Sequence, residues 1–198
     1  MDKLPLNLKN IKEQHDNVCD SFDYGVDLKL TQAILKKYPQ NTEKEIVALK
    51  IFLINTTNST NLRSYKKQIH INDLAEIICN IKDFDERVVN GEDSVVEELA
   101  KCNDKIKLFS FASKYCCYHN NLVYGNDDYS IFDTILKKHL HLYIPKATPS
   151  LLETYRQTID YKSYNSIITE FLKEKGLAQH KNMKRMFDHF VWNQFREK

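Results

Sequence analysis

Hydrophobic residues follow a helical repeat along most of this 198-residue chain. Across Leu28–Tyr38 they fall on one helical face until Pro39 interrupts the pattern, which predicts a first helix ending there. Thr42 and Glu45 have the spacing of a capping box, and the residues that follow, up to Ile54, are apolar on nearly every side. We therefore expect the second helix to lie in the interior of the domain.

The remaining segments extend the same pattern. Residues 1–25 mix charges with scattered apolar positions and are predicted to form an arm, and the polar run Asn55–Asn61 is predicted to be an interhelical loop. Further helices are predicted at 61–69, 72–81, 94–101, after the segment 105–115, and at 130–143, 150–175 and 181–196. Only 4 Gly and 4 Pro interrupt the chain, and no repeat or strand-like alternation is present. The prediction is an all-α fold in one domain, residues 1–198.

Charge and cysteine content narrow the function classes. The net charge of +2 excludes a histone-like binder that acts through charge alone, so a nucleic-acid surface would have to be local. There is no apolar run of the roughly 18 residues that span a bilayer and no signal-peptide core near the start, so we expect a cytoplasmic protein. The five cysteines form no CxxC pair, which favours reduced thiols and predicts neither disulfides nor a metal site.

One motif carries the candidate chemistry. The segment Leu108-Phe109-Ser110-Phe111-Ala112-Ser113-Lys114 fits the hairpin Leu-Pro-Gly-Val-Gly-x-Lys of the helix-hairpin-helix (HhH-GPD) DNA glycosylases, with the lysine aligned. In the lysine-bearing members an aspartate that opens a helix follows nineteen positions later, and here 133 minus 114 gives nineteen. The chain therefore resembles this superfamily, in particular its 8-oxoguanine glycosylase branch, and also similar phage-related proteins.

The resemblance implies a fold and a set of roles. The fold would be two helical lobes around a cleft, with 26–145 carrying the site and 146–198 completing the second lobe. Lys114 and Asp133 would be catalytic, and the partner would be double-stranded DNA with a damaged or modified base, bound by a monomer without a cofactor. Wedge or DNA-contacting residues would be Asn55, Asn58, Ser110, Ala112 and Ser113. Base-pocket residues would be Phe109, Phe111, Tyr115, Tyr118, His119 and Phe132.

These residue types suit the chemistry of base excision. A carboxylate stabilises the positive charge that develops on the sugar when its bond to the base breaks. A lysine amine can then attack C1′ and allow strand cleavage, but only in its neutral form, so its pKa must fall below about 10.4. The base must first leave the duplex, and a side chain must fill its place. Lys105, Lys107, Lys137 and Lys138 could contact phosphates beside the site.

Other interpretations of the same residues stay open. Lys114 could be a solvated surface lysine, Asp133 could only cap a helix, and Asn55–Asn61 could only connect helices. The Met183–Trp192 segment is read as one buried face, with Lys184, Arg185 and Arg196 outside it. Ser110 and Ala112 replace the two hairpin glycines, which favours a non-catalytic DNA-binding or phage-defence protein that keeps the fold. A third alternative is an unrelated helical protein with an accidental spacing.

Overall fold

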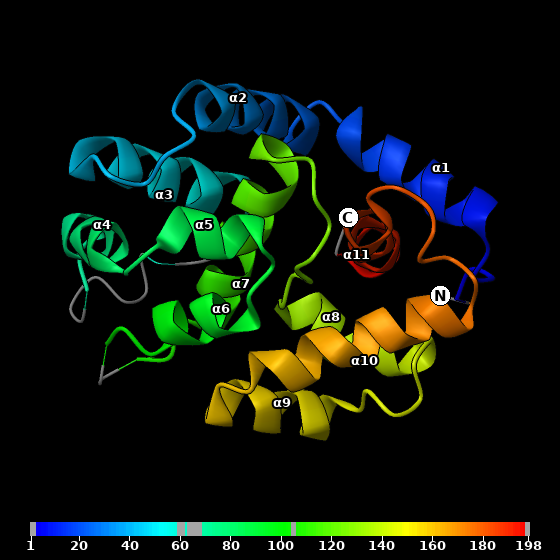
Figure 1. The fold of residues 1–198 in the computed structure, drawn as a ribbon. Coiled ribbons are helices and arrows are strands. Elements are labelled where there is room, and N and C mark those ends of the chain that lie inside the picture. Colours follow the sequence, from blue (N-terminus) through cyan, green and yellow to red (C-terminus); the bar gives the residue numbers. More distant parts are fainter. Residues whose placement is uncertain (1–2, 59–61, 63–68, 104–105, 197–198) are drawn as a thin grey trace.

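The chain is all helical in a computed structural model that describes residues 3–58, 62, 69–103 and 106–196 (Figure 1). No strand occurs among these residues, which confirms the predicted all-α class. The helices, in chain order, are α1 (Leu8–Cys19), α2 (Tyr24–Lys37), α3 (Lys44–Asn58), α4 (Ile71–Asn80), α5 (Phe84–Val89), α6 (Asp93–Ala100), α7 (Phe109–Tyr118), a π-helical turn η2 (His119–Val123), α8 (Thr134–His139), a 3₁₀ turn η3 (Leu140–Leu142), α9 (Pro149–Thr158), α10 (Tyr161–Glu174) and α11 (Met183–Phe195).

Helix α7 forms the centre of the molecule. Every residue from Phe111 to Asn120 is buried, and α7 packs against α3 and α6. Helix α3 buries Val47, Ile51 and Ile54, but Leu49 and Phe52 on its other side are 39% and 49% exposed, so the predicted burial on nearly every side is wrong. The two central helices thus provide a rigid support for any side chain that projects from them.

The N-terminal segment is helical, which contradicts the predicted arm. Helix α1 begins at an Asn7 cap, whose side chain accepts a hydrogen bond from the Asn10 N–H at 2.8 Å. It buries Ile11 and Val18 and packs along α11 at the other end of the chain. The sequence analysis missed it because only Ile11 and Val18 are buried among many charged and polar residues, and because its packing partner lies far away in sequence.

Three other boundaries also differ from the prediction. Helix α3 continues to Asn58, because Thr56 and Thr57 donate hydroxyl hydrogen bonds to the carbonyls of Phe52 and Leu53, both at 2.9 Å, and so do not compete with the helix. Helix α5 was not predicted, and α9 and α10 are separated at Ile159, which has φ 55°. The predicted helix at 61–69 lies almost wholly outside the described residues.

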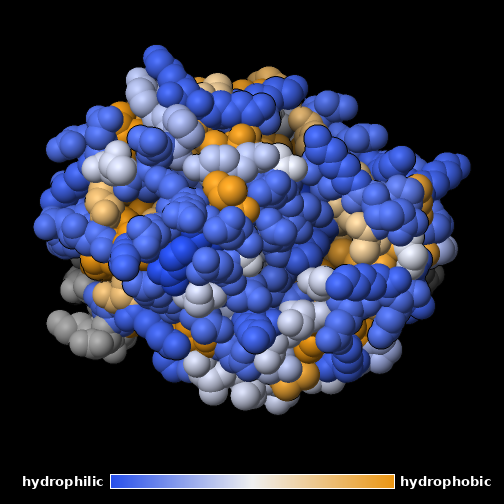
Figure 2. Space-filling view, in the orientation of Figure 1, coloured by the Kyte–Doolittle hydropathy of each residue, from blue (hydrophilic) through white to orange (hydrophobic). Residues whose placement is uncertain are grey.

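The face of the molecule in the view of Figure 1 is largely hydrophilic. Figure 2 shows hydrophobic residues on it only in separate patches, which argues against a large apolar docking surface on this side. Among the helices that the structure describes, none combines the length and the apolar character needed to cross a membrane.

Candidate active site

Lys114 and Asp133 line one small cavity of about 100 Å³. The cavity lies where α7 and the start of α8 meet α11, and α2 and α3 close its remaining sides. The full lining consists of Tyr24, Thr57, Lys114, Ile131, Asp133, Arg185, Asp188, His189 and Trp192. The fold therefore brings together the two residues that the sequence paired by spacing.

Lys114 is a buried lysine, not a surface one. Its side chain belongs to the sixth residue of α7, which is 4% exposed. Burial lowers the pKa of Lys114, partly opposed by the carboxylates of Asp133 and Asp188, while Arg185 lowers it further. The structure has no hairpin turn where the motif implied one: α7 begins at Phe109, residues 110–113 are helical, and Lys114 lies in the second turn of the helix. Desolvation, not the helix terminus, is the main cause of its lowered pKa.

Asp133 caps helix α8 and also faces the cavity. Its Oδ1 accepts a hydrogen bond from the Leu136 N–H at 2.7 Å, with Asp133 in the extended N-cap conformation. This bond fixes the carboxylate at the start of the helix, where the dipole stabilises its negative charge. Capping and a place beside Lys114 are therefore compatible. The helix predicted from Ser130 begins only after this cap.

Ser113 holds the two candidate residues in register. Its Oγ accepts a hydrogen bond from the Phe132 N–H at 3.1 Å and donates one to the Ser110 carbonyl at 3.0 Å. Phe132 directly precedes Asp133, and Ser113 directly precedes Lys114. The Ser113 hydroxyl thus joins the segment that carries Lys114 to the segment that carries Asp133, at the residue before each of them. Tyr164 supports the 131–133 segment, because its hydroxyl donates a hydrogen bond to the Ile131 carbonyl.

Replacing Ser113 by Ala is expected to lower the free energy of unfolding by about 1–3 kcal/mol, because it leaves the buried Phe132 N–H without its acceptor. Ser110→Ala is the matched control: Ser110 is half-buried and contributes only its backbone carbonyl to this link, so we expect a change within about 0.5 kcal/mol. Urea denaturation of both variants gives the comparison. Equal effects would show that the Ser113 hydroxyl does not secure the 131–133 segment.

The predicted phosphate contacts at this motif need correction. Ala112 and Ser113 are fully buried, so neither reaches a DNA backbone at the surface; only Ser110 is partly accessible. Position 112 faces the core because α7 is surrounded by protein on all sides. Ser110 and Ala112, which replace the hairpin glycines, therefore lie in a helix and not in a tight exposed turn.

The residues predicted for the aromatic pocket are also buried. The residues proposed for it, which are between 0% and 3% exposed, lie in the core and do not line the cavity: Phe109, Phe111, Tyr115, Tyr118, His119 and Phe132. Phe109 packs edge-on against Phe132, with ring centroids 4.9 Å apart. Tyr115 donates its hydroxyl to Asn41 Oδ1 at 2.7 Å in a buried polar network. The rings that do line the cavity are Tyr24, Trp192 and the imidazole of His189, with the Tyr24 and Trp192 centroids 5.4 Å apart.

His119 is also a core residue. Its Nδ1 lies 2.9 Å from the Tyr115 carbonyl oxygen, and its Nε2 has no hydrogen-bond partner among the described residues. Burial lowers the pKa of His119 to about 3. The imidazole is therefore neutral at physiological pH and cannot stabilise the C-terminal dipole of α7 as a cation.

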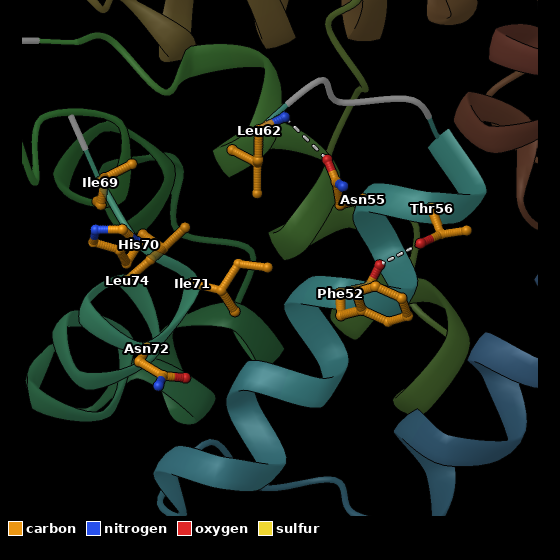
Figure 3. Close-up of a pocket in the computed structure, with 9 residues that line it drawn as sticks. All are labelled: Phe52, Asn55, Thr56, Leu62, Ile69, His70, Ile71, Asn72 and Leu74. Carbon is orange, nitrogen blue, oxygen red and sulfur yellow. Dashed lines mark hydrogen bonds between the residues drawn. The ribbon is translucent and has the colours of Figure 1, made fainter. Parts of the chain in front are cut away.

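The proposed wedge residues do not lie at this cavity. Asn55 lines a separate pocket of about 710 Å³ between α3 and α4, where its Oδ1 accepts from the Leu62 N–H at 3.1 Å (Figure 3). Two positions along a helix turn by about 200°, so Thr57, which does line the Lys114 cavity, lies on the opposite face of α3. Asn58 ends α3, and its side chain lies outside what the structure describes.

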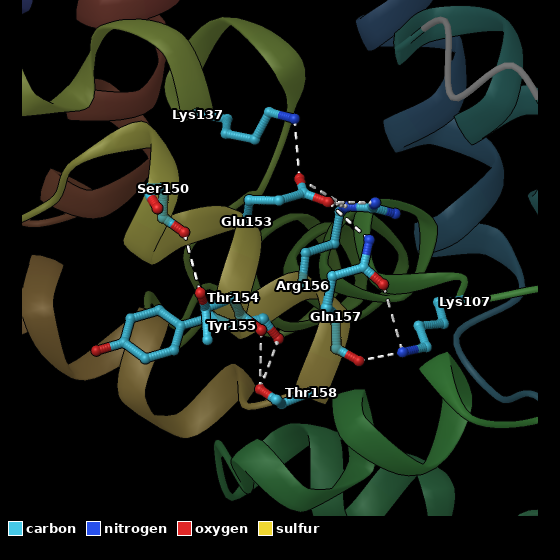
Figure 4. Close-up of polar contacts among 9 residues, drawn as sticks. All are labelled: Lys107, Lys137, Ser150, Glu153, Thr154, Tyr155, Arg156, Gln157 and Thr158. Atoms are coloured by element: carbon cyan, nitrogen blue, oxygen red, sulfur yellow. Dashed lines mark hydrogen bonds and ion pairs between the residues drawn. The ribbon is translucent and has the colours of Figure 1, made fainter.

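Two lysines assigned to phosphate contacts bind protein groups instead. Lys137 Nζ lies 2.9 Å from Glu153 Oε2, and Lys107 donates to the Gln157 carbonyl (Figure 4). Hydrogen bonds from Arg156 and Gln157 lower the pKa of the Glu153 carboxyl, with Lys137 adding to them. Lys138 is exposed, and Lys105 lies outside the described residues. Among the described lysines of this set, Lys107 and Lys138 are exposed and Lys137 is half-buried.

A buried ion pair that lines the cavity was not predicted. Arg185 and Asp188 of α11 form a buried ion pair, with Nη1 to Oδ2 at 2.6 Å. Arg185 Nη2 also donates to the hydroxyls of Tyr24 at 2.5 Å and Tyr118 at 3.0 Å. The expected exposure of Arg185 is therefore wrong. Burial raises the pKa of Asp188 to about 7, against the opposing effect of Arg185. The sequence did contain a signal for this ion pair: Asp188 lies within the apolar face of 183–191, and a buried acid needs a partner.

The comparisons with known proteins cover the first part of this site. Residues 7–123 match the family model HI_0787_N, described as an N-terminal domain; this range includes Lys114 but ends before Asp133. An uncharacterized protein of Haemophilus influenzae is 29% identical over 141 residues, which is 70% of this chain and 60% of that protein. The chain thus spans less than two thirds of its relative's length. No solved structure matches.

Proposed function

The chain belongs to the HI_0787_N family, and we propose that it is a DNA glycosylase that excises a damaged or modified base, with Lys114 as nucleophile and Asp133 as the stabilising carboxylate. The observation that carries this proposal is the shared cavity: a buried amine with a lowered pKa and a carboxylate fixed by a helix cap face the same small space. The motif spacing that resembles helix-hairpin-helix glycosylases supports it independently.

The proposed fold is the two-lobed arrangement of that superfamily. Its support is the position of the cavity. Lining residues come from α2, α3 and α7 in the first 123 residues, and from the segment just before α8 and from α11 in the remainder. A DNA strand that enters between these two groups of helices would present a sugar to Lys114 and Asp133 together.

The chemistry follows from the two groups. As the bond between C1′ and the base breaks, its electron pair leaves with the base, and the Asp133 carboxylate stabilises the positive charge left on the sugar. The neutral Lys114 amine donates its electron pair to C1′ and then loses a proton, and opening of the sugar ring gives an imine. Loss of a proton from C2′ then expels the 3′ phosphate, which is the lyase step.

The cavity must open to admit a base. A volume of about 100 Å³ holds about three water molecules at roughly 30 Å³ each, whereas ligand pockets measure about 300–1,000 Å³. Trp192 and Tyr24 are the lining rings that are only half-buried. Their displacement would enlarge the space beside Lys114, and both could then stack on an extruded base.

A non-catalytic DNA-binding or phage-defence protein is the second candidate. The small volume of the cavity and the replacement of both hairpin glycines by Ser110 and Ala112 favour it. Such a protein would bind duplex DNA without releasing a base, so the same experiment separates the two functions.

The test uses duplexes that each carry one oxidised or otherwise modified base, with free base and strand breaks as the readouts. We expect base release from at least one duplex, and a loss of about 100-fold or more in Asp133→Asn, the size typical of removing one transition-state stabilising group. Asp160→Asn is the matched control, because Asp160 also caps a helix, accepting from the Ser163 N–H at 3.0 Å, but lies outside the cavity.

Asp160→Asn is expected to keep the native rate. DNA binding without base release on the whole panel would support the non-catalytic candidate. Equal rates in the native chain and Asp133→Asn would remove Asp133 from the mechanism.

A further inference from the structure

A second cluster of reactive side chains lies on the other side of His189, between α1 and α11. It consists of His15, Cys19 and His189, and one ligand atom from each can be chosen so that all three lie within 4.8 Å of one another. Within the described residues, this is the group of His, Cys, Asp and Glu side chains that could hold a metal ion. It takes no part in the chemistry proposed for Lys114 and Asp133.

The geometry of the two histidines points at one shared position. His15 Nδ1 and His189 Nδ1 lie 2.9 Å apart, and the two rings are stacked with centroids 4.8 Å apart. Two such nitrogens share one proton between them, and a cation would take the place of that proton. His189 Nε2 lies 3.4 Å from the Tyr24 hydroxyl, an outer contact of the kind that orients metal-binding imidazoles.

Cys19 supplies the third group from the same helix face as His15. The two residues are four positions apart on α1, a spacing that places side chains next to each other, and Cys19 Sγ lies 3.6 Å from His15 Nε2. In a tetrahedral zinc site, bonds of about 2.0–2.1 Å to nitrogen and 2.3 Å to sulfur put the ligand atoms about 3.3–3.6 Å apart. His15 faces His189 through Nδ1 and Cys19 through Nε2, so a single ion would use only one of these two nitrogens. One ligand atom from each residue lies within 4.8 Å of the others, and side-chain rotation would have to bring these atoms closer together.

The surroundings allow a cation and leave one position open. Arg185 lies nearby, but its charge is paired with Asp188 at 2.6 Å. Asp16 and Asp20 place negative charge near Cys19, and Lys29 places positive charge there. His15 and Cys19 are half-buried and line a surface pocket of about 390 Å³. Water from this pocket could complete the coordination.

We propose that His15, Cys19 and His189 form a binding site for Zn²⁺, with two imidazole nitrogens, one thiolate and a water as ligands. Binding breaks the S–H bond of Cys19, forms a sulfur–zinc bond and releases the proton to solvent. The ion would fasten α1 to α11, next to the wall of the Lys114 cavity that His189 also forms. The sequence predicted no metal site because no short Cys or His motif marks it, and His189 lies 174 positions after His15.

The test uses Co²⁺ as a spectroscopic probe for Zn²⁺ on the full chain freed of metal with a chelator. We expect one Co²⁺ per chain with the visible absorption of a tetrahedral ion and a thiolate charge-transfer band in the near ultraviolet, both displaced by Zn²⁺. Cys19→Ser should lose the charge-transfer band, and His15→Gln should weaken binding at least tenfold. Cys102→Ser, which changes another half-buried thiol, should behave as the native chain.

Thermal unfolding provides the second measurement. Zn²⁺ should raise the midpoint of the native chain and of Cys102→Ser, because a ligand that binds only the folded state stabilises it. Cys19→Ser should show no such rise. Absence of the charge-transfer band in the native chain, or an unchanged affinity in both Cys19→Ser and His15→Gln, would overturn the proposal. This result is independent of base release, so either proposal can fail alone.

Discussion

The Lys114→Gln variant is expected to form no covalent adduct with DNA. In the proposed mechanism the imine joins Lys114 Nζ to C1′, and borohydride reduces it to a stable secondary amine. Native protein incubated with a cleavable duplex and borohydride should therefore give a band of the combined mass on a denaturing gel. Gln retains the size and polarity of the side chain but has no nucleophilic amine. We expect the adduct to fall below detection, a loss of several orders of magnitude.

Lys184→Gln is the matched control for this experiment. Lys184 is a half-buried lysine whose pKa is also lowered by burial, but its Nζ donates to Asn165 Oδ1 at 3.0 Å, away from the cavity. Its replacement should leave the adduct unchanged. An adduct that persists in Lys114→Gln and disappears in Lys184→Gln would show that the nucleophile is Lys184 of α11, and would contradict the proposal for Lys114 of α7. Base release that survives Lys114→Gln without an adduct would indicate a hydrolytic glycosylase that depends on Asp133 alone.

The pH dependence of adduct formation tests the cause of the reactivity. Burial lowers the pKa of Lys114, so the neutral amine becomes abundant at a lower pH than for a free lysine, whose pKa is about 10.4. The adduct rate should rise with pH and level off below that value. A midpoint at the free-lysine value would show that the amine reacts from a solvated state.

The Arg185→Met variant is expected to lose about 3–5 kcal/mol of unfolding free energy, because it leaves the Asp188 carboxylate buried without its partner. Arg185 is 5% exposed and Asp188 is 7% exposed, so water replaces little of the lost interaction. The same change also removes donors from the Tyr24 and Tyr118 hydroxyls. Urea denaturation followed by circular dichroism measures the loss.

Two further variants separate the ion pair from side-chain size. The double variant Arg185→Met with Asp188→Leu should recover most of the stability, since it leaves no unpaired charge. Arg87→Met is the surface control. Arg87 contacts Glu92 at 3.2 Å and Glu98 at 2.6 Å with more exposed side chains, so its loss should cost about 0–1 kcal/mol. Similar losses in Arg185→Met and Arg87→Met would contradict a desolvated pair at the cavity.

Local sequence signals identified much of the fold and two residues of the candidate site. Pro39 and the Thr42–Glu45 pattern correctly separate α2 from α3, and Leu74 and Ile78 correctly mark α4. These features depend on interactions between residues a few positions apart, which sequence periodicity records directly. The spacing of Lys114 and Asp133 also proved spatially meaningful, because the Ser113 hydroxyl ties their two segments together.

Only the tertiary structure decided which other side chains surround these two. Tyr24 and Arg185 are 161 positions apart, and His15 and His189 are 174 apart, yet helix packing places each pair in hydrogen-bond contact. The aromatic residues near the motif were expected in a pocket but fill the core, because α7 is enclosed on every side. No local pattern distinguishes a ring that packs in the core from one that lines a cavity. That difference depends on which distant helices cover the surface, and so on the packing of the whole chain.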